Sequence, residues 1–323
     1  MQKKTWPVIL SAVIAAKAVF LTALCVLSCQ RRPLYVELSA NPEVLITPDW
    51  GKVDEIPEGI ESFIYDEDGR LVRRILSSDI SSISYELPDG LYTAVVISDS
   101  ESEYRSLSFH NIDSYRDLVI TSRESGTGKS TTLQTCKAEW LSTGVSGPFE
   151  INIDSEKDTY ILYRNWHSGE YTPIKSSLSE VPCMMRDATV HFRLKAWVDD
   201  AKTVTDMKLY IQGVSIGWNV SKASALSKTG TLEVQDWRRT QHGESVDSFE
   251  SEAVSFGFPG ATPATAFISI LFDRSDGSTY SITEMTVPVR VNEGDIELVI
   301  ASPDTPILLP PVTAGSDEIS TSK

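Results

Sequence analysis

The sequence predicts an all-β protein with two β-sandwich domains in tandem. Several stretches alternate apolar and polar residues with a period of two, which is typical of strands that bury one face. Turn residues separate these stretches at short, regular intervals, as they do in sandwiches. After residue 29 no segment keeps a convincing helical apolar period over a dozen residues, and 131–141 is the best helix candidate. The two domains are expected at 34–180 and 181–301.

The first domain is expected to contain a hairpin and a Pro-Asp-Gly turn. Residues 62–65 and 71–76 are β-prone and flank the acidic turn Asp66-Glu67-Asp68-Gly69. An EF-hand calcium loop is not expected there, because Ser77 stands where its closing glutamate would fall. The turn Pro88-Asp89-Gly90 leads into the β-prone run 91–97, an order that recurs in transthyretin-like Greek-key sandwiches. Core positions are expected at Leu87, Tyr92 and Val95.

The second domain is expected to contain long strands. Alternation marks strands at 188–198, 204–214, 266–272 and 281–287, and a last clear strand lies at 295–300. Asp276-Gly277 between the third and fourth of these predicts a hairpin. The polar, serine-rich stretch 168–186 contains the expected boundary near residue 180. Residues 302–323, with four prolines and a polar end, are expected to form an extended tail.

The first 28 residues have the pattern of a lipoprotein signal peptide. Lys3 and Lys4 precede an apolar run at 18–27, and Ser28 stands directly before Cys29. A membrane-spanning helix is the alternative, but Lys17 near the middle of such a span costs about 2.5–3.5 kcal/mol. An ordinary secretory signal would leave a free thiol at the mature N-terminus. The prediction is therefore a signal peptide at 1–28, a lipid on Cys29 and a tether at 29–33.

The net charge narrows the range of binding partners, and the cysteine content limits the possible disulfides. Residues 1–28 carry three lysines and no acidic residue, so their removal changes the net charge from −16 to −19. Such a charge disfavours nucleic acid and direct adhesion to an anionic membrane surface. Beyond Cys29 only Cys136 and Cys183 remain. They are a possible disulfide, although spacing alone does not establish the geometry of a bridge.

One run resembles a nucleotide site. Gly128-Lys129-Ser130 matches the end of a phosphate-binding P-loop, but Arg123 stands where the motif requires its first glycine. The flanking segments are β-prone, whereas a P-loop joins a strand to a helix. No nucleotide is therefore expected to bind, and 123–131 is expected to be a solvated loop.

No cofactor, metal or catalytic site is expected elsewhere. The histidines lack the spacing of a zinc site, and no G-x-S-x-G elbow signals a Ser-His-Asp hydrolase. The pairs Asp199-Asp200 and Asp66/Asp68 are interpreted as solvated turn residues. The tryptophans raise the idea of glycan stacking, although core packing explains most aromatics in sandwiches. These histidines and tryptophans are His110, His167, His191, His242, Trp50, Trp140, Trp166, Trp197, Trp218 and Trp237.

Together these features resemble the fimbrillin-like lipoproteins of Bacteroidales. The residues that carry the resemblance are Cys29-Gln30-Arg31-Arg32-Pro33-Leu34, Ile46-Thr47-Pro48-Asp49-Trp50, Lys137-Ala138-Glu139-Trp140-Leu141 and the strand pair 189–198 and 204–214. The resemblance implies two transthyretin-like sandwiches, palmitate-type lipidation, display at the outer membrane and assembly by strand exchange. Some relatives polymerise after cleavage behind an arginine, whereas others stay lipidated and anchor or regulate the fibre. No decisive cleavage site is found here, which favours the anchor or accessory role.

The leading hypothesis is a non-enzymatic, lipid-anchored surface protein that binds fimbrial subunits or other surface proteins by strand addition. In such contacts main-chain hydrogen bonds give affinity, and pockets for alternate side chains give register. The candidate donor is Pro306-Ile307-Leu308-Leu309-Pro310, although its prolines remove ladder donors. One alternative is a surface glycan-binding lipoprotein, which would expose a row of tryptophans. Another is a hydrolase with a buried Ser-His-Asp group.

Overall fold

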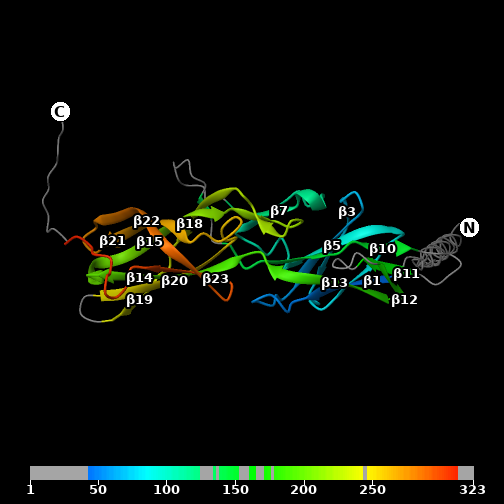
Figure 1. Cartoon of the computed structure of the whole chain (residues 1–323), viewed down its shortest axis with the longest axis horizontal. Coiled ribbons are helices and arrows are strands. Elements are labelled where there is room, and N and C mark those ends of the chain that lie inside the picture. Colours follow the sequence, from blue (N-terminus) through cyan, green and yellow to red (C-terminus); the bar gives the residue numbers. More distant parts are fainter. Residues whose placement is uncertain are drawn as a thin grey trace, which may run out of the picture. The chain divides into compact units, whose positions relative to one another are not determined.

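The computed structural model describes residues 43–123, 134–135, 138–152, 160–164, 171–175, 178–242 and 246–311 (Figure 1). The chain divides into two units, Met1–Ala40 and Asn41–Lys323, and every described residue belongs to the second. The described part is all-β, as predicted, and its strands form three sheets. The expected signal peptide, the tether and the start of the first expected domain, residues 34–42, lie outside the described residues.

The first sheet contains most strands of the first half. Its order is β12-β11-β10-β5-β9-β13-β1-β4, with β2 paired to β5 and β3 paired to β2. These strands are β1 (Glu43–Asp49), β2 (Ile60–Tyr65), β3 (Leu71–Ser77), β4 (Ile83–Glu86), β5 (Gly90–Ser98), β9 (Ser142–Ser146), β10 (Phe149–Asn152), β11 (Tyr160–Arg164), β12 (Tyr171–Lys175) and β13 (Leu178–Asp187). The β2/β3 pair is the expected hairpin, and Gly69 in its turn has a φ of 79°, which favours glycine.

Strand β5 is buried on both faces. Ala94 and Val96 belong to one core, whereas Val95 and Ile97 belong to a second core on the opposite face. A strand between two apolar layers keeps a continuous apolar run instead of alternating. This position explains the β-prone run 91–97, and the expected core residues Leu87, Tyr92 and Val95 are all buried.

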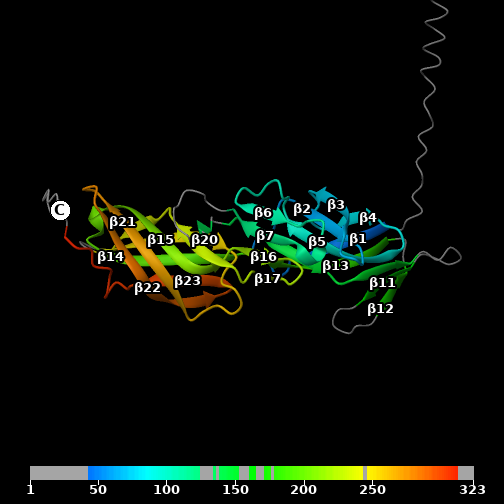
Figure 2. The ribbon, with the colours of Figure 1, turned by 90° about the horizontal axis from the view of Figure 1, so that it is seen from above.

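A four-stranded sheet joins the two halves of the chain. β6 (Leu107–His110) and β7 (Val119–Ser122) come from the first half, while β16 (Gly217–Asn219) and β17 (Ser224–Ala225) come from the second. The order is β17-β16-β7-β6, so β16 pairs directly with β7 (Figure 2). Gly217 allows this approach, since a Cβ there would lie 2.4 Å from the carbonyl oxygen of Ile120. The core in this region contains residues of both halves, among them Phe63, Leu118, Ile120, Val220 and Phe256.

The second sheet has the order β19-β20-β14-β23-β22-β21-β15-β18-β8. Its strands are β8 (Gln134–Thr135), β14 (Val190–Asp199), β15 (Val204–Ser215), β18 (Thr229–Val234), β19 (Arg238–Gln241), β20 (Val246–Ser255), β21 (Thr265–Arg274), β22 (Thr279–Asn292) and β23 (Asp295–Ile300). All five strands expected in the second domain are present. On β14, Phe192 and Leu194 enter the core while Arg193 and Lys195 lie on the outer face, which produces the alternation seen in the sequence.

The chain passes from the first sheet to the second after residue 187. Strand β13 ends at Asp187 and β14 begins at Val190, so the boundary expected near residue 180 falls within β13. Two pairings cross between the halves, β8 with β18 and β16 with β7. The division into domains at 34–180 and 181–301 stays a proposal, and the change of sheet is its structural counterpart.

Residues 138–141, part of a run that contributes to the fimbrillin resemblance, connect the two halves. The amide of Ala138 donates a hydrogen bond to the carbonyl oxygen of Val254 over 2.8 Å. The indole of Trp140 stacks on the imidazole of His191, with ring centroids 4.8 Å apart. This stretch therefore fixes a segment of the first half against β14 and β20.

Helical structure in the described residues is limited to two 3-10 turns, η1 (Tyr115–Asp117) and η2 (Ala201–Thr203). The helix candidate at 131–141 is wrong where it is described, because β8 occupies 134–135 and 138–141 is not helical. Among the described residues, no helix is long and apolar enough to span a membrane.

Candidate functional site: the C-terminal segment on strand β14

The chain beyond β23 turns back onto the second sheet. Ala301 has a φ of 64°, and Ser302 and Thr305 exchange backbone hydrogen bonds of 3.3 and 3.1 Å across a tight turn. The turn brings Pro306–Leu309, called here the C-terminal segment, to the end of β14. Part of the tail expected at 302–323 is therefore packed against the sheet, and residues beyond 311 lie outside the described part.

Ile307 pairs with β14 through two main-chain hydrogen bonds. Its amide donates to the carbonyl oxygen of Trp197 over 2.8 Å, and its carbonyl oxygen accepts from the amide of Asp199 over 2.9 Å. The pairing is parallel and centred on Val198. Strand β20 pairs with the whole of β14 along one edge. The other edge of β14 pairs with β23 from Phe192 to Ala196, and Ile307 pairs with it just beyond that point.

The side chains of the C-terminal segment alternate like those of a strand. Ile307 and Leu309 are 6% and 9% exposed and belong to the core of the second sheet, whereas Leu308 is 69% exposed. Pro306 and Pro310 flank these residues and have no N–H to add to the ladder. Two apolar side chains and two backbone hydrogen bonds therefore hold the segment on the sheet.

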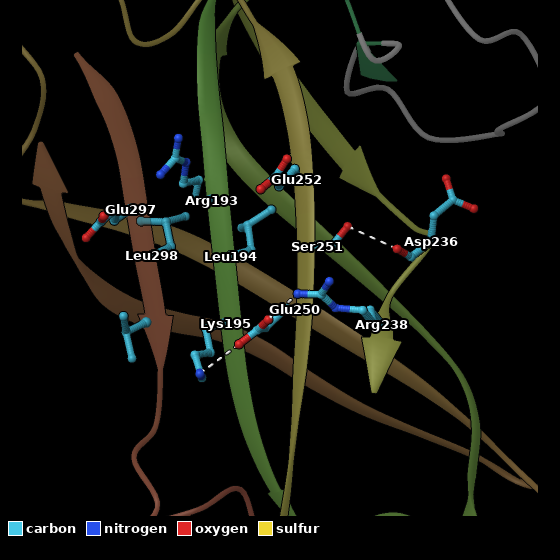
Figure 3. Close-up of a pocket in the computed structure, with 11 residues that line it drawn as sticks. Arg193, Leu194, Lys195, Asp236, Arg238, Glu250, Ser251, Glu252, Glu297 and Leu298 are labelled. Carbon is cyan, nitrogen blue, oxygen red and sulfur yellow. Dashed lines mark hydrogen bonds and ion pairs between the residues drawn. The ribbon is translucent and has the colours of Figure 1, made fainter. Parts of the chain in front are cut away.

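The outer face of the same sheet carries a charged groove (Figure 3). This hollow of 540 Å³ is lined from β14, β19, β20 and β23 by residues that include Arg193, Lys195, Arg238, Glu250, Glu252 and Glu297. Lys195 and Arg238 both donate to Glu250, over 2.7 and 2.8 Å, and these hydrogen bonds lower the pKa of the Glu250 carboxyl. Arg193 pairs with Asp295 over 2.7 Å. The cations of the groove are thus neutralised by carboxylates of the same face, as on an ordinary solvated sheet.

The described tryptophans do not form a glycan platform. Trp50, Trp218 and Trp237 pack against the three cores, while Trp140 and Trp197 pack against His191 and His242. None of these five belongs to the exposed large apolar side chains. Trp166 lies outside the described residues. The row of exposed tryptophans that the glycan hypothesis requires is absent from the part of the chain that the structure describes.

One serine and histidine come together, but not as a catalytic pair. Nε2 of His242 lies 2.8 Å from Oγ of Ser248. Ser248 is fully buried, so a substrate does not reach its hydroxyl, and the neighbouring Asp247 is paired with Arg239. His110 contacts the hydroxyl of Thr121 at 2.9 Å, and His167 lies outside the described residues. No cluster of three metal-binding side chains occurs in the described ranges.

The acidic pairs have the expected turn roles. Asp66 accepts a hydrogen bond from the amide of Arg70 over 2.8 Å, and Asp199 accepts one from the amide of Asp200 over 3.0 Å. Arg123 donates to the carbonyl oxygen of Leu107 over 2.9 Å, while residues 124–131 of the P-loop-like run lie outside the described part.

Cys183 has a free thiol in the core of the first sheet. Its side chain is fully buried against β9, where a Cβ at Gly144 would lie 2.8 Å from its Sγ. Burial raises the pKa of this thiol to about 12, so it is protonated at neutral pH. Cys29 and Cys136 lie outside the described residues. Lipidation of Cys29 and a bridge between Cys136 and Cys183 therefore stay predictions.

Comparison with known protein families identifies the family of this chain. The model of a domain of unknown function, DUF5119, matches residues 28–234, which is more than half of the sequence. The chain belongs to the DUF5119 family. No curated protein matches this DUF5119 chain.

One solved structure shares the fold of this DUF5119 protein, and others are similar at a lower level. A candidate adhesin from Bacteroides ovatus has a TM-score of 0.58 at 14% identity, over 88% of this chain and 98% of that chain. A candidate adhesin from Bacteroides thetaiotaomicron has 0.47 at 14% identity, over 76% and 81%, and the fimbrial anchor protein Mfa2 from Porphyromonas gingivalis has 0.43 at 11% identity, over 75% and 81%. Conclusions are drawn from the first of these matches alone, and it shows a shared fold. The expected all-β sandwich fold is thereby confirmed.

Proposed function

We propose that this DUF5119 protein is a non-enzymatic cell-surface protein of the fimbrial anchor or accessory type. It is held at the outer membrane by a lipid on Cys29, and it binds fimbrial subunits or other surface proteins by strand addition. The observation that carries the proposal is the C-terminal segment, which two hydrogen bonds hold on β14. The fold shared with the Bacteroides ovatus candidate adhesin supports the surface role.

Strand addition at this edge of β14 would use defined hydrogen-bonding groups. An incoming strand would use the carbonyl oxygen of Trp197 and the amide of Asp199, the groups that now bond to Ile307. It would also fill the core positions of Ile307 and Leu309. The C-terminal segment competes at an effective concentration in the millimolar range, because it belongs to the same chain.

The resident segment is held on β14 by few bonds. It makes only the two main-chain bonds of Ile307 there, and Pro306, Pro310 and Pro311 have no N–H to donate. The free part of this edge is short, because β23 covers Phe192 to Ala196 and β14 ends at Asp199, so a partner strand makes the same two bonds and gains its advantage from apolar side chains at the positions of Ile307 and Leu309. The resident segment thus serves as a placeholder that such a partner strand displaces.

Site-specific photo-crosslinking on intact cells tests the partner assignment. A photoreactive side chain in place of Leu308, which is exposed beside the proposed docking row, is expected to capture a fimbrial subunit. The matched control carries the same group in place of Phe267, which is 56% exposed on β21, and is expected to capture none. If neither variant yields a fimbrial subunit, the partner assignment is wrong.

Metabolic labelling tests the anchor separately. Labelled palmitate is expected to enter the unmodified protein and to be absent from Cys29→Ala. Incorporation that survives this substitution would exclude Cys29 as the lipid attachment site.

A further inference from the structure

Arg274 stands at a position where the sheet pattern calls for an apolar residue. It is the last residue of β21, on which Ile268, Ile270 and Phe272 face the core. Arg274 follows this alternation and is only 6% exposed. The strand therefore buries a permanent positive charge at the end of the core of the second sheet.

The guanidinium of Arg274 lacks a hydrogen-bonding partner on one side. Its Nε and Nη2 are both buried, and neither donates a hydrogen bond. Arg274 forms no ion pair with the described residues, and its Cζ lies over the ring of Tyr280, 5.9 Å from the ring centroid. Hydrogen bonds from the hydroxyl and amide of Ser278, over 2.6 and 2.9 Å, and the charge of Arg274 lower the pKa of the Asp276 carboxyl, but Asp276 lies too far from Arg274 for an ion pair.

The two unpartnered nitrogens form a single recognition edge. In arginine, Nε–H and the adjacent Nη2–H point in parallel, and this fork matches the two oxygens of a carboxylate. Burying a charge without a partner is strongly unfavourable, whereas a paired and hydrogen-bonded charge is tolerated. A vacant fork in a buried guanidinium thus points to an anionic ligand.

Hydrogen bonds hold the backbone around Arg274 in place. The amide of Arg274 donates to Ser278, its carbonyl oxygen accepts from Gly277, and Ser275 donates to Thr203, over 2.9, 3.0 and 2.8 Å. The turn residues 275–279 are nevertheless exposed, so the buried fork lies close to the surface. A small planar anion needs to pass only this turn.

We propose that Arg274 is a receptor for a carboxylate, which binds in bidentate fashion to the Nε–Nη2 edge at the end of the β21/β22 hairpin. The apolar residues beside it, Phe272 and its strand partner Tyr280, favour a singly charged, planar group over a more strongly hydrated phosphate. The carboxylate has two sources, a small carboxylate from solution or the acidic residues that follow position 311, among them Asp317 and Glu318. This proposal is independent of strand addition.

Thermal unfolding of the full chain in sodium acetate tests the proposal, with sodium chloride at equal ionic strength as reference. Acetate is expected to raise the Tm by about 2–4 °C above chloride in the unmodified protein, if the site is free. Arg274→Met is expected to abolish this difference. Arg290→Met, which removes an exposed arginine from β22, is expected to retain it.

A variant that ends at residue 311 separates the two sources. If the chain's own acidic tail fills the fork, the acetate effect is absent from the full chain and present in the shortened one, where Arg274→Met again removes it. If acetate fills it, both lengths respond alike. An equal response to acetate and chloride in both lengths, or an acetate response that survives Arg274→Met, would overturn the proposal.

Two measurements keep the test decisive if Arg274→Met folds poorly. Arg274→Lys retains the charge but not the fork, and its response to acetate is expected to fall at least about fivefold. In ¹⁵N-arginine-labelled protein, the Nε–H resonance of Arg274 is expected to shift on addition of acetate but not of chloride. An unchanged resonance in both lengths of the chain would contradict the proposal.

Discussion

The amide of Ile307 lies 2.8 Å from the carbonyl oxygen of Trp197, and this bond attaches the C-terminal segment to β14. The same edge of β14 is occupied by β23 between Phe192 and Ala196. Two separate pieces of chain thus share one edge, and the second piece is short and flanked by prolines. A partner strand that replaces it leaves β23 and most of the core in place.

The ion pair between Arg74 and Glu61 supports the first sheet. The side chain of Glu61 is fully buried, and Arg74, which is 41% exposed, also bonds to Glu101 over 2.8 Å. Arg74→Met leaves the buried carboxylate without its cation. We expect a loss of about 1–3 kcal/mol in chemical denaturation, less than for a fully buried pair because Arg74 is partly solvated.

The neighbouring Arg73 provides the control for this experiment. Arg73 is exposed on the same strand, and Arg73→Met is expected to change the unfolding free energy by no more than about 0.5 kcal/mol. Similar losses in the two variants would show that the Glu61 pair is unimportant.

The hydrogen bonds of Glu139 make the stability of the protein sensitive to acid. Partial burial raises the pKa of its carboxyl, but hydrogen bonds from the amides of Ser106 and Arg105 and from the Ser106 hydroxyl outweigh this, so the pKa is lowered in the folded state. The stabilisation is therefore present above the unfolded-state pKa, near 4.3, and is lost as the pH falls through the lower folded value. In Tm measurements from pH 6 to 3, Glu139→Gln is expected to lose less stability than the unmodified protein.

Glu86→Gln is the matched control, because Glu86 is exposed on β4. It is expected to follow the acid response of the unmodified protein. Identical pH profiles for Glu139→Gln and the unmodified protein would argue against a role of Glu139 in that response.

Cys183 is expected to resist alkylation in the native state. Its thiol is buried and its pKa is raised to about 12, so both access and the thiolate form are suppressed. Iodoacetamide at pH 8 should label it at least about 100-fold more slowly than in denaturant, as followed by peptide mass spectrometry. A peptide that links Cys183 to Cys136 in non-reduced protein would instead establish the disulfide.

Gly217 is expected to be essential to the sheet that joins the halves. Gly217→Ala would place its Cβ 2.4 Å from the carbonyl oxygen of Ile120, so β16 must move away from β7. Overpacking of this kind costs about 1–3 kcal/mol, seen as a lower Tm. Gly51→Ala meets only the flexible side chain of Asp49 and is expected to have little effect. Equal Tm values for the two variants would show that the close approach is easily relaxed.

Local alternation was sufficient to predict the strands of the second sheet, because each of them buries one face. It predicted β14, β15, β21, β22 and β23 within a few residues. Alternation does not specify pairing between distant segments, so the joint between β7 and β16 and the addition of β8 to β18 could not be predicted. Those pairings depend on side chains packed between the halves, such as Phe63 and Val220.

The candidate site was only partly visible in the sequence. Ile307, Leu308 and Leu309 show a strand pattern, but three residues between prolines do not reveal which strand they join. The docking onto the chain's own β14 is set by the turn at Ala301–Thr305. Arg274 carried a clearer signal, since the alternation of β21 places a charged residue at a core position.

The affinity of a fluorescein-labelled peptide of residues 304–311, measured by fluorescence anisotropy, tests the exchange of the C-terminal segment most directly. Ile307→Asp in the protein expels the resident segment, because it would bury a carboxylate in the core. Without that competitor, the variant is expected to bind the peptide at least about 10-fold more tightly than the unmodified protein does. Leu308→Asp, at an exposed position, should bind like the unmodified protein. Equal affinity in all three proteins, or no binding to Ile307→Asp, would contradict the account.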